Sequence, residues 1–186
     1  MTMMLKSRAL RVGALACGLA ALLMNPAAAA PDAFFVQAGT AGSTHEASAG
    51  LVWDWKGWPL SESSSLTAHW ELALSRWSYR EAEVRKSAWL LQVAAIPVVR
   101  WRPNAGSSAW FVQGGIGATL TSRRYETDQK NFSTRFNFGD HLALGRSFGP
   151  RREREIALRL EHFSNAGIKH PNPGENFFEL RYLQRL

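Results

Sequence analysis

Apolar and polar residues alternate with a period of two over most of the chain after residue 30. Successive side chains of a β-strand point to opposite faces, so this alternation predicts strands with one apolar and one polar face. Turn-forming stretches such as Gly57-Trp58-Pro59 and Pro103-Asn104-Ala105-Gly106 separate the runs. Eight candidate strands result, and they begin near Phe34, Glu46, Leu66, Trp89, Trp110, Phe136, Glu153 and Asn176.

Eight is the smallest even strand number typical of transmembrane barrels. After residue 30 no run of eighteen apolar residues occurs, so no membrane-spanning helix is expected. The expected fold is therefore all-β, an eight-stranded antiparallel transmembrane β-barrel over residues 31–186. A soluble sandwich or lipocalin-like barrel is the alternative. Tryptophans near the predicted strand ends would form an interfacial girdle: Trp53, Trp55, Trp77, Trp89, Trp101 and Trp110.

Residues 1–30 have the pattern of a cleaved secretory signal peptide. A basic segment precedes an apolar run over residues 12–24, and Ala28-Ala29-Ala30 fits a small-residue cleavage site. The single cysteine, Cys17, lies within this segment, so the mature barrel would have no disulfide. A barrel exported in this way is expected in the outer membrane.

The charge balance favours an anionic partner. Removing the three signal-segment cations (Lys6, Arg8 and Arg11) from the formal charge of +7 leaves +4 on the mature part. Anionic lipid headgroups are the natural partners of a membrane-facing basic protein. Nucleic acid is not expected, because the cations are scattered rather than grouped in a run with aromatic residues.

The predicted strand over residues 153–164 carries candidate chemistry. His162 and Ser164 share the parity of Ile156, Leu158 and Leu160, so they end the apolar, lipid-facing side. They lie about 6–7 Å apart at Cα. A neutral imidazole can take the hydroxyl proton as the serine attacks an ester carbonyl. The pattern suggests a hydrolytic site for a membrane lipid; the alternative is two polar residues at a strand end.

The loop after this strand supplies further candidates. Asn165 offers an amide and Gly167 an unhindered backbone N–H close to Ser164, and either could stabilise an oxyanion. Ordinary turn chemistry is the alternative explanation for both residues. The hydrolysis needs no metal and no cofactor, and none is expected.

The stretch HFSNAGIK at residues 162–169, followed by PNPG at 171–174, resembles the signature of the PagL family of lipid A 3-O-deacylases, which are eight-stranded outer-membrane barrels. The resemblance implies a carboxylic ester hydrolase that releases the 3-hydroxyacyl chain of lipid A in lipopolysaccharide. It also implies His162 as base, Ser164 as nucleophile and Asn165 as important for activity. Lys169, His170 and Arg181 could approach the lipid A phosphates, or be ordinary solvated charges.

The resemblance places the family's acid, a glutamate, at Asn176 when residues are counted without a gap. The neighbouring Glu175 is expected to complete the triad, because a carboxylate best stabilises the imidazolium. In a regular strand, however, Glu175 would point inward. Asn176, as an amide that fixes the imidazole tautomer, is the alternative.

Two other functions stay open: a non-enzymatic structural or adhesive barrel, and an outer-membrane phospholipase. Acyl-chain preference and a homodimer are also left open. If both termini face the periplasm, the seventh strand runs outward, which places His162 and Ser164 near the outer leaflet, where lipid A resides.

Overall fold

A computed structural model describes residues 30–56, 65–82 and 86–186. The predicted signal peptide lies outside these residues except for Ala30. Every regular element in the described part is a strand, and there are eight: β1 (Ala33–Ala41), β2 (Thr44–Asp54), β3 (Leu66–Arg80), β4 (Ser87–Trp101), β5 (Trp110–Thr121), β6 (Phe136–Phe148), β7 (Arg154–Ser164) and β8 (Glu175–Arg185). Among the described residues, no helix is long and apolar enough to cross a membrane.

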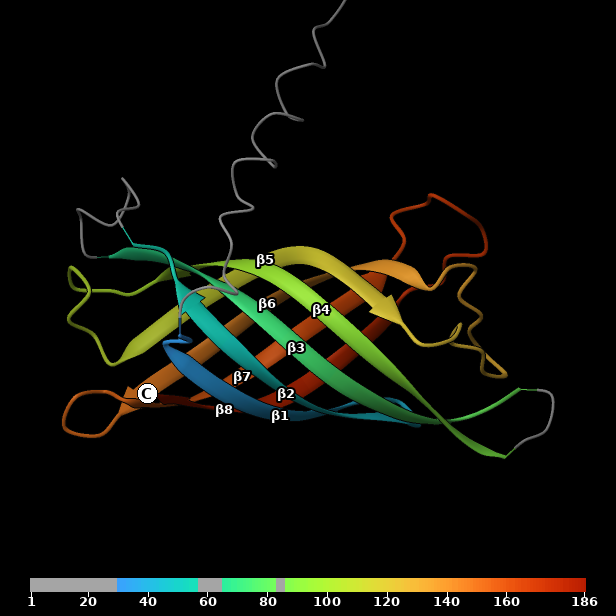
Figure 1. Ribbon diagram of the computed structural model, residues 1–186, viewed down its shortest axis with the longest axis horizontal. Coiled ribbons are helices and arrows are strands. Elements are labelled where there is room, and N and C mark those ends of the chain that lie inside the picture. Colours follow the sequence, from blue (N-terminus) through green and yellow to red (C-terminus); the bar gives the residue numbers. More distant parts are fainter. Residues whose placement is uncertain (1–29, 57–64, 83–85) are drawn as a thin grey trace, which may run out of the picture. The chain divides into compact units, whose positions relative to one another are not determined.

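The strands form one closed antiparallel barrel (Figure 1). Each strand pairs with the next in sequence, and β8 returns to β1 with a register that runs from Ala33↔Arg185 to Thr40↔Phe178. Closure leaves no sheet edge with unpaired backbone groups, which is the condition for a sheet to cross a bilayer. The predicted strand number and antiparallel order are confirmed.

The barrel is apolar outside and charged inside. Leu142 and Leu180 on the outer face are 63% and 57% exposed, whereas Glu71 and Arg159 inside the barrel are 2% exposed. A soluble lipocalin-like barrel would have the opposite distribution, because its core must be apolar. The structure is therefore a transmembrane barrel, with outward side chains that meet lipid.

Ion pairs fill much of the interior. Arg159 contacts Glu71 at 2.9 Å and Glu161 at 2.8 Å, and Arg181 contacts the same Glu71 at 2.7 Å. A buried charge costs several kcal/mol unless it is paired, so these contacts offset the desolvation of one another. Arg181, 3% exposed, thus belongs to the interior, and both interpretations of its charge are wrong: it neither approaches the lipid A phosphates nor is a solvated surface charge.

Trp77 is not part of the interfacial girdle. Trp89, Trp101 and Trp110 are about half exposed near strand ends, as expected, but Trp77 is fully buried. It shares the inward parity of Ser75 and Tyr79 on β3. Its ring packs against Phe163 of β7 and Phe177 of β8, with centroids 5.0 and 4.7 Å away. Trp77 therefore packs against the end of β7 and the start of β8 from inside the barrel.

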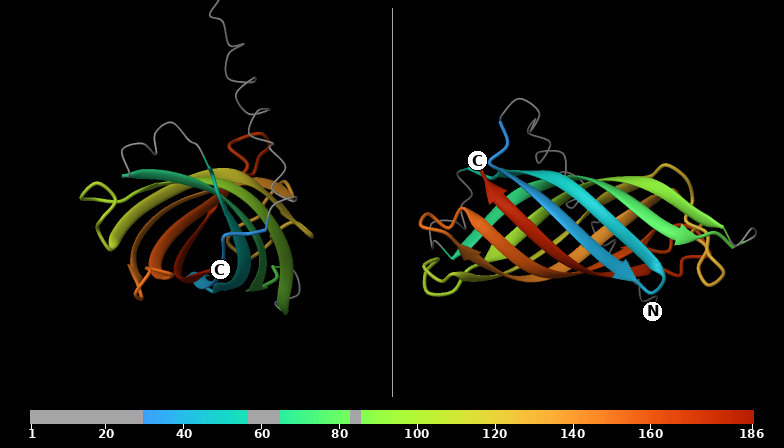
Figure 2. Two further views of the ribbon diagram at one scale, coloured as in Figure 1. Left: turned by 60° about the vertical axis from the view of Figure 1, so that its left-hand side comes forward. Right: turned by 90° about the horizontal axis from the view of Figure 1, so that it is seen from below.

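One end of the barrel, here called the loop end, carries the β1–β2, β3–β4, β5–β6 and β7–β8 connections. The start of β1 and the C-terminus lie together at the opposite end (Figure 2). β7 runs toward the loop end and finishes there at Ser164. The end of β7 thus lies at the same edge of the barrel as the connections 122–135 and 165–174.

Candidate active site

His162 and Ser164 lie on the outer face of β7, as the alternation predicted. Their inward neighbours Glu161 and Phe163 are buried, whereas the two themselves are half-buried at the end of an exposed apolar row. In the barrel wall His162 lies between Asp140 of β6 and Asn176 of β8. Trp77 packs against Phe163 inside the barrel. This contact on the inner face of β7 helps to position His162 and Ser164 on its outer face.

His162 has a defined hydrogen-bond partner. Its Nδ1 lies 2.7 Å from Oδ1 of Asn176. A carbonyl oxygen only accepts, so Nδ1–H donates this bond and the lone pair lies on Nε2. Among the described residues no hydrogen bond joins His162 to Ser164, but catalytic hydrogen bonds are often long until a substrate binds. The pair therefore has the tautomer that a general base requires.

The structure does not bring Glu175 to His162. β8 is already regular at Glu175, so this side chain points inward, opposite Phe163, and is 4% exposed. Lys130 Nζ donates to Glu175 Oε1 at 2.6 Å, and the Tyr125 hydroxyl donates to Oε2 at 2.9 Å. Burial raises the pKa of Tyr125, which keeps its hydroxyl protonated for this bond. Glu175 thus anchors the 122–135 connection, and Asn176 is the residue beside the imidazole.

Asn165 and Gly167, the expected oxyanion donors, are both engaged in holding the loop. The Asn165 amide nitrogen donates to the carbonyl of Lys169 at 2.7 Å and to the hydroxyl of Ser133 at 3.0 Å. The Gly167 N–H donates to Asn165 Oδ1 at 3.0 Å. Asn165, 1% exposed, therefore ties the 165–174 connection to the 122–135 connection.

Asn172 is a residue whose position the sequence did not reveal. Its Oδ1 accepts a hydrogen bond from the backbone N–H of Asn165 at 3.0 Å, directly after Ser164. Among the described residues its amide nitrogen donates to no other group. The sequence indicated only a turn here, because the contact depends on how residues 165–174 fold back.

Asp140 is the second residue that was missed. It lies opposite His162 on β6, on the same outer face, and is half-buried. The signal was present in the alternation: Asp140 interrupts an apolar stripe that includes Phe138 and Leu142. In the described ranges, no group of three or more His, Cys, Asp or Glu side chains could hold a metal ion.

Gly174 forms the surface against which the His162 ring lies. A Cβ added at Gly174 would come within 2.6 Å of His162 Cε1 and 3.2 Å of Nε2. The residue also has a φ of +66°, a conformation that costs a side-chain-bearing residue about 1 kcal/mol. Both observations require glycine at this position.

We expect Gly174→Ala to lower kcat about 100-fold, because a catalytic group displaced by about 1 Å can cost that much. Gly42→Ala is the matched control for kcat at saturating substrate: Gly42, in the β1–β2 turn away from the His162 ring, has a φ of +60°, but a Cβ there meets nothing within 4 Å. Ester hydrolysis by the two purified variants gives the comparison. Equal rates in both would mean that the ring does not depend on Gly174.

The family model described as lipid A 3-O-deacylase (PagL) matches residues 35–185. Lipid A deacylase PagL of Bordetella bronchiseptica is 39% identical over 112 residues, which span 60% of this chain but only 58% of that protein. Lipid A deacylase PagL of Pseudomonas aeruginosa is 30% identical over 134 residues, 72% of this chain and 73% of that protein.

A solved structure has the same architecture. The crystal structure of the outer membrane enzyme PagL superposes with a TM-score of 0.63 at 26% identity, and the match covers 83% of this chain and 99% of that one. The family match includes all eight strands except the first two residues of β1, together with the segment 162–176. The chain therefore belongs to the lipid A 3-O-deacylase (PagL) family.

Proposed function

We propose that this chain is an outer-membrane esterase that removes the 3-O-linked hydroxyacyl chain of lipid A, with Ser164 as nucleophile and His162 as general base. The observation that carries the proposal is the 2.7 Å contact of His162 Nδ1 with Asn176, made on the lipid-facing side of the barrel beside Ser164. The relatives named lipid A deacylase support the choice of substrate.

The reaction follows from the atoms present. Ser164 Oγ attacks the ester carbonyl carbon while His162 Nε2 takes the hydroxyl proton. The tetrahedral intermediate collapses, the bond to the sugar oxygen breaks, and His162 returns the proton to that oxygen. Water then attacks the acyl-serine, with His162 again as base. The products are a 3-hydroxy fatty acid and lipid A with a free 3-hydroxyl group.

Three neighbours support this pair. Asn176 holds the imidazole in the required tautomer through its Oδ1. Asp140 lies directly opposite His162 across the strand pair, where facing Cβ atoms are about 5 Å apart, and a carboxylate there favours the imidazolium that forms during attack. Asn172 is the proposed oxyanion donor, because Asn165 and Gly167 are engaged within the loop and its own amide nitrogen is not.

The location of the pair suits a substrate that stays in the membrane. Leu160 precedes His162 by two residues on β7 and pairs with Phe178 of β8. Both side chains are more than half exposed on the outer face. The acyl chains of a lipid can lie against these side chains while the ester reaches Ser164 at the rim. A water-soluble substrate would not need a site that is reached from the lipid-facing surface.

The identity of the third residue is tested by two variants at adjacent positions. We expect Asn176→Leu to lower kcat about 100-fold, because the imidazole loses the acceptor that orients it. Glu175→Gln is expected to keep kcat within about threefold, since its partners Tyr125 and Lys130 belong to the 122–135 connection and not to the outer face that carries His162. If Glu175→Gln lowered kcat strongly and Asn176→Leu did not, Glu175 would be the third residue of the triad.

The proposed activity is tested with the purified barrel in detergent micelles. Lipid A and a diacyl phospholipid are supplied separately, and the released acids are identified by gas chromatography with mass spectrometry. Release of 3-hydroxy fatty acid from lipid A alone is the expected result. Release from phospholipid would favour the phospholipase, and release from neither would favour a structural barrel.

A homodimer of the barrel is a separate proposal. Its test is the mass of the protein component of the purified protein–detergent complex, measured by light scattering. A mass of one chain would exclude the dimer under those conditions.

A further inference from the structure

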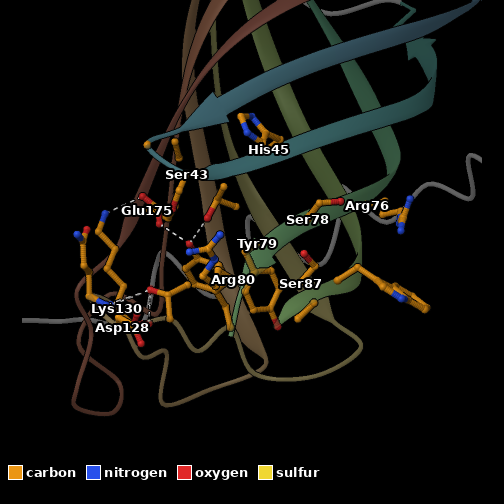
Figure 3. Close-up of a pocket in the computed structure, with 18 of the residues that line it drawn as sticks. Ser43, His45, Arg76, Ser78, Tyr79, Arg80, Ser87, Asp128, Lys130 and Glu175 are labelled. Atoms are coloured by element: carbon orange, nitrogen blue, oxygen red, sulfur yellow. Dashed lines mark hydrogen bonds and ion pairs between the residues drawn. The ribbon is translucent and has the colours of Figure 1, made fainter. Parts of the chain in front are cut away.

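A cavity of about 840 Å³ opens at the loop end of the barrel (Figure 3). Its lining comes from the β1–β2 turn, the ends of β3 and β4, the 122–135 connection and Asn176 of β8. Asn176 is also the residue that contacts His162. The cavity and the proposed catalytic pair therefore share a wall.

The cavity exists because the barrel wall is lower at the β1–β2 hairpin. β1 ends at Ala41 and β2 begins at Thr44, so the β2–β3 pairing finishes at His45↔Ser78. The β3–β4 pairing continues further, to Arg80↔Ser87. The longer β3–β4 strand pair and the 122–135 connection thus extend past a short turn and border the space above it.

The lining mixes polar and apolar side chains and carries exposed cations. Arg76 and Arg80 lie at the rim of the cavity, on the outer face of β3, whereas Lys130 and Glu175 lie across from Arg76 and neutralise each other at 2.6 Å (Figure 3). In the described part of the chain neither arginine forms an ion pair; Arg76 instead lies over the Trp89 ring at 5.5 Å. Hydroxyl groups complete the lining, among them those of Ser43, Ser78 and Ser87.

We propose that this cavity holds the phosphorylated sugar headgroup of the substrate, and that Arg76 and Arg80 bind its phosphate. Guanidinium groups match phosphate oxygens in a bidentate geometry, and hydroxyl groups suit a sugar. The inference rests on the proposed function, because lipid A carries its phosphates and its 3-O-ester on one disaccharide. A headgroup seated here sets the ester over Ser164 from the Asn176 side.

The test compares phosphorylated lipid A with lipid A from which the phosphates have been removed and the 3-O-acyl chain kept. The full barrel and its Arg76→Gln/Arg80→Gln variant are assayed on both. We expect the wild type to have a higher kcat/KM on the phosphorylated lipid than on the other. In the double variant this ratio should fall about tenfold, because KM for the phosphorylated lipid rises. Arg146→Gln is the matched control, because Arg146 lies over Trp110 at 5.7 Å on another part of the barrel.

An unchanged preference in the double variant would overturn the assignment, as would an equal loss on both lipids. Loss of the wild-type preference in excess phosphatidylglycerol would assign the cavity to a phospholipid headgroup instead. Failure of the proposed function has a different signature, since neither lipid would release its acyl chain. Binding of phosphorylated lipid A to the Ser164→Ala barrel, with and without the two arginines, then tests the cavity by itself.

Discussion

Ser164→Ala is expected to reduce the rate of acyl release at least about 1,000-fold, because removal of the nucleophile leaves only water to attack the ester. The barrel should fold normally, since Ser164 is half-buried at the end of β7 and the change removes one oxygen atom. The loss should appear in kcat rather than in KM, because the lipid still meets the same outer surface.

The measurement is the initial rate of 3-hydroxy fatty acid release by purified wild type and variant in the same detergent. Ser107→Ala is the control, because Ser107 is exposed in the β4–β5 connection at the other end of the barrel. Circular dichroism verifies that each variant retains its strands. Appreciable activity in Ser164→Ala would mean that another group attacks the ester.

His162→Gln is expected to cost a similar factor, about 1,000-fold or more, because the serine then keeps its proton during attack. Glutamine retains an amide that can contact Asn176, so the surface beside Ser164 changes little. His170→Gln serves as the control, since His170 is exposed in the adjoining 165–174 connection.

The combination of the two changes is more informative than either alone. Groups that act as one unit lose their contribution together, so the Ser164→Ala/His162→Gln variant should be no slower than the slower single variant. Single-turnover rates of the four proteins complete the cycle. Losses that multiply would indicate that the two residues act independently.

The strand pattern could be predicted from sequence because it depends on local alternation. Inward and outward faces of β7 follow from single-residue parity, and the same rule located His162 and Ser164 on the lipid side. Trp77 was assigned to the girdle from its place near a strand end, although its parity with Tyr79 already pointed inward. Parity was a better guide than position along the strand.

The third residue of the site shows the same lesson. Parity favoured Asn176, whereas the chemical preference for a carboxylate favoured Glu175, and the side chains follow parity. The roles of Asn165 and Asn172 could not be predicted, because their partners come from folded connections. Ser133, which accepts a bond from Asn165, lies 32 residues earlier in the chain.

The site also illustrates how a barrel wall only one residue thick can be organised. Along β7, inward Phe163 packs on Trp77 while outward His162 and Ser164 meet lipid. On β8, inward Phe177 packs on the same ring beside outward Asn176. The aromatic cluster inside thus limits movement of the three outward side chains, and this supports the precision that proton transfer requires.

The most direct test of the central claim is mass spectrometry of lipid A from a Gram-negative host that expresses the wild type or Ser164→Ala. The account predicts that lipid A loses the mass of one 3-hydroxyacyl chain with the wild type, and that it is unchanged with the variant when both barrels are present in the outer membrane. Unchanged lipid A with a correctly inserted wild-type barrel, or the same mass loss with Ser164→Ala, would contradict it.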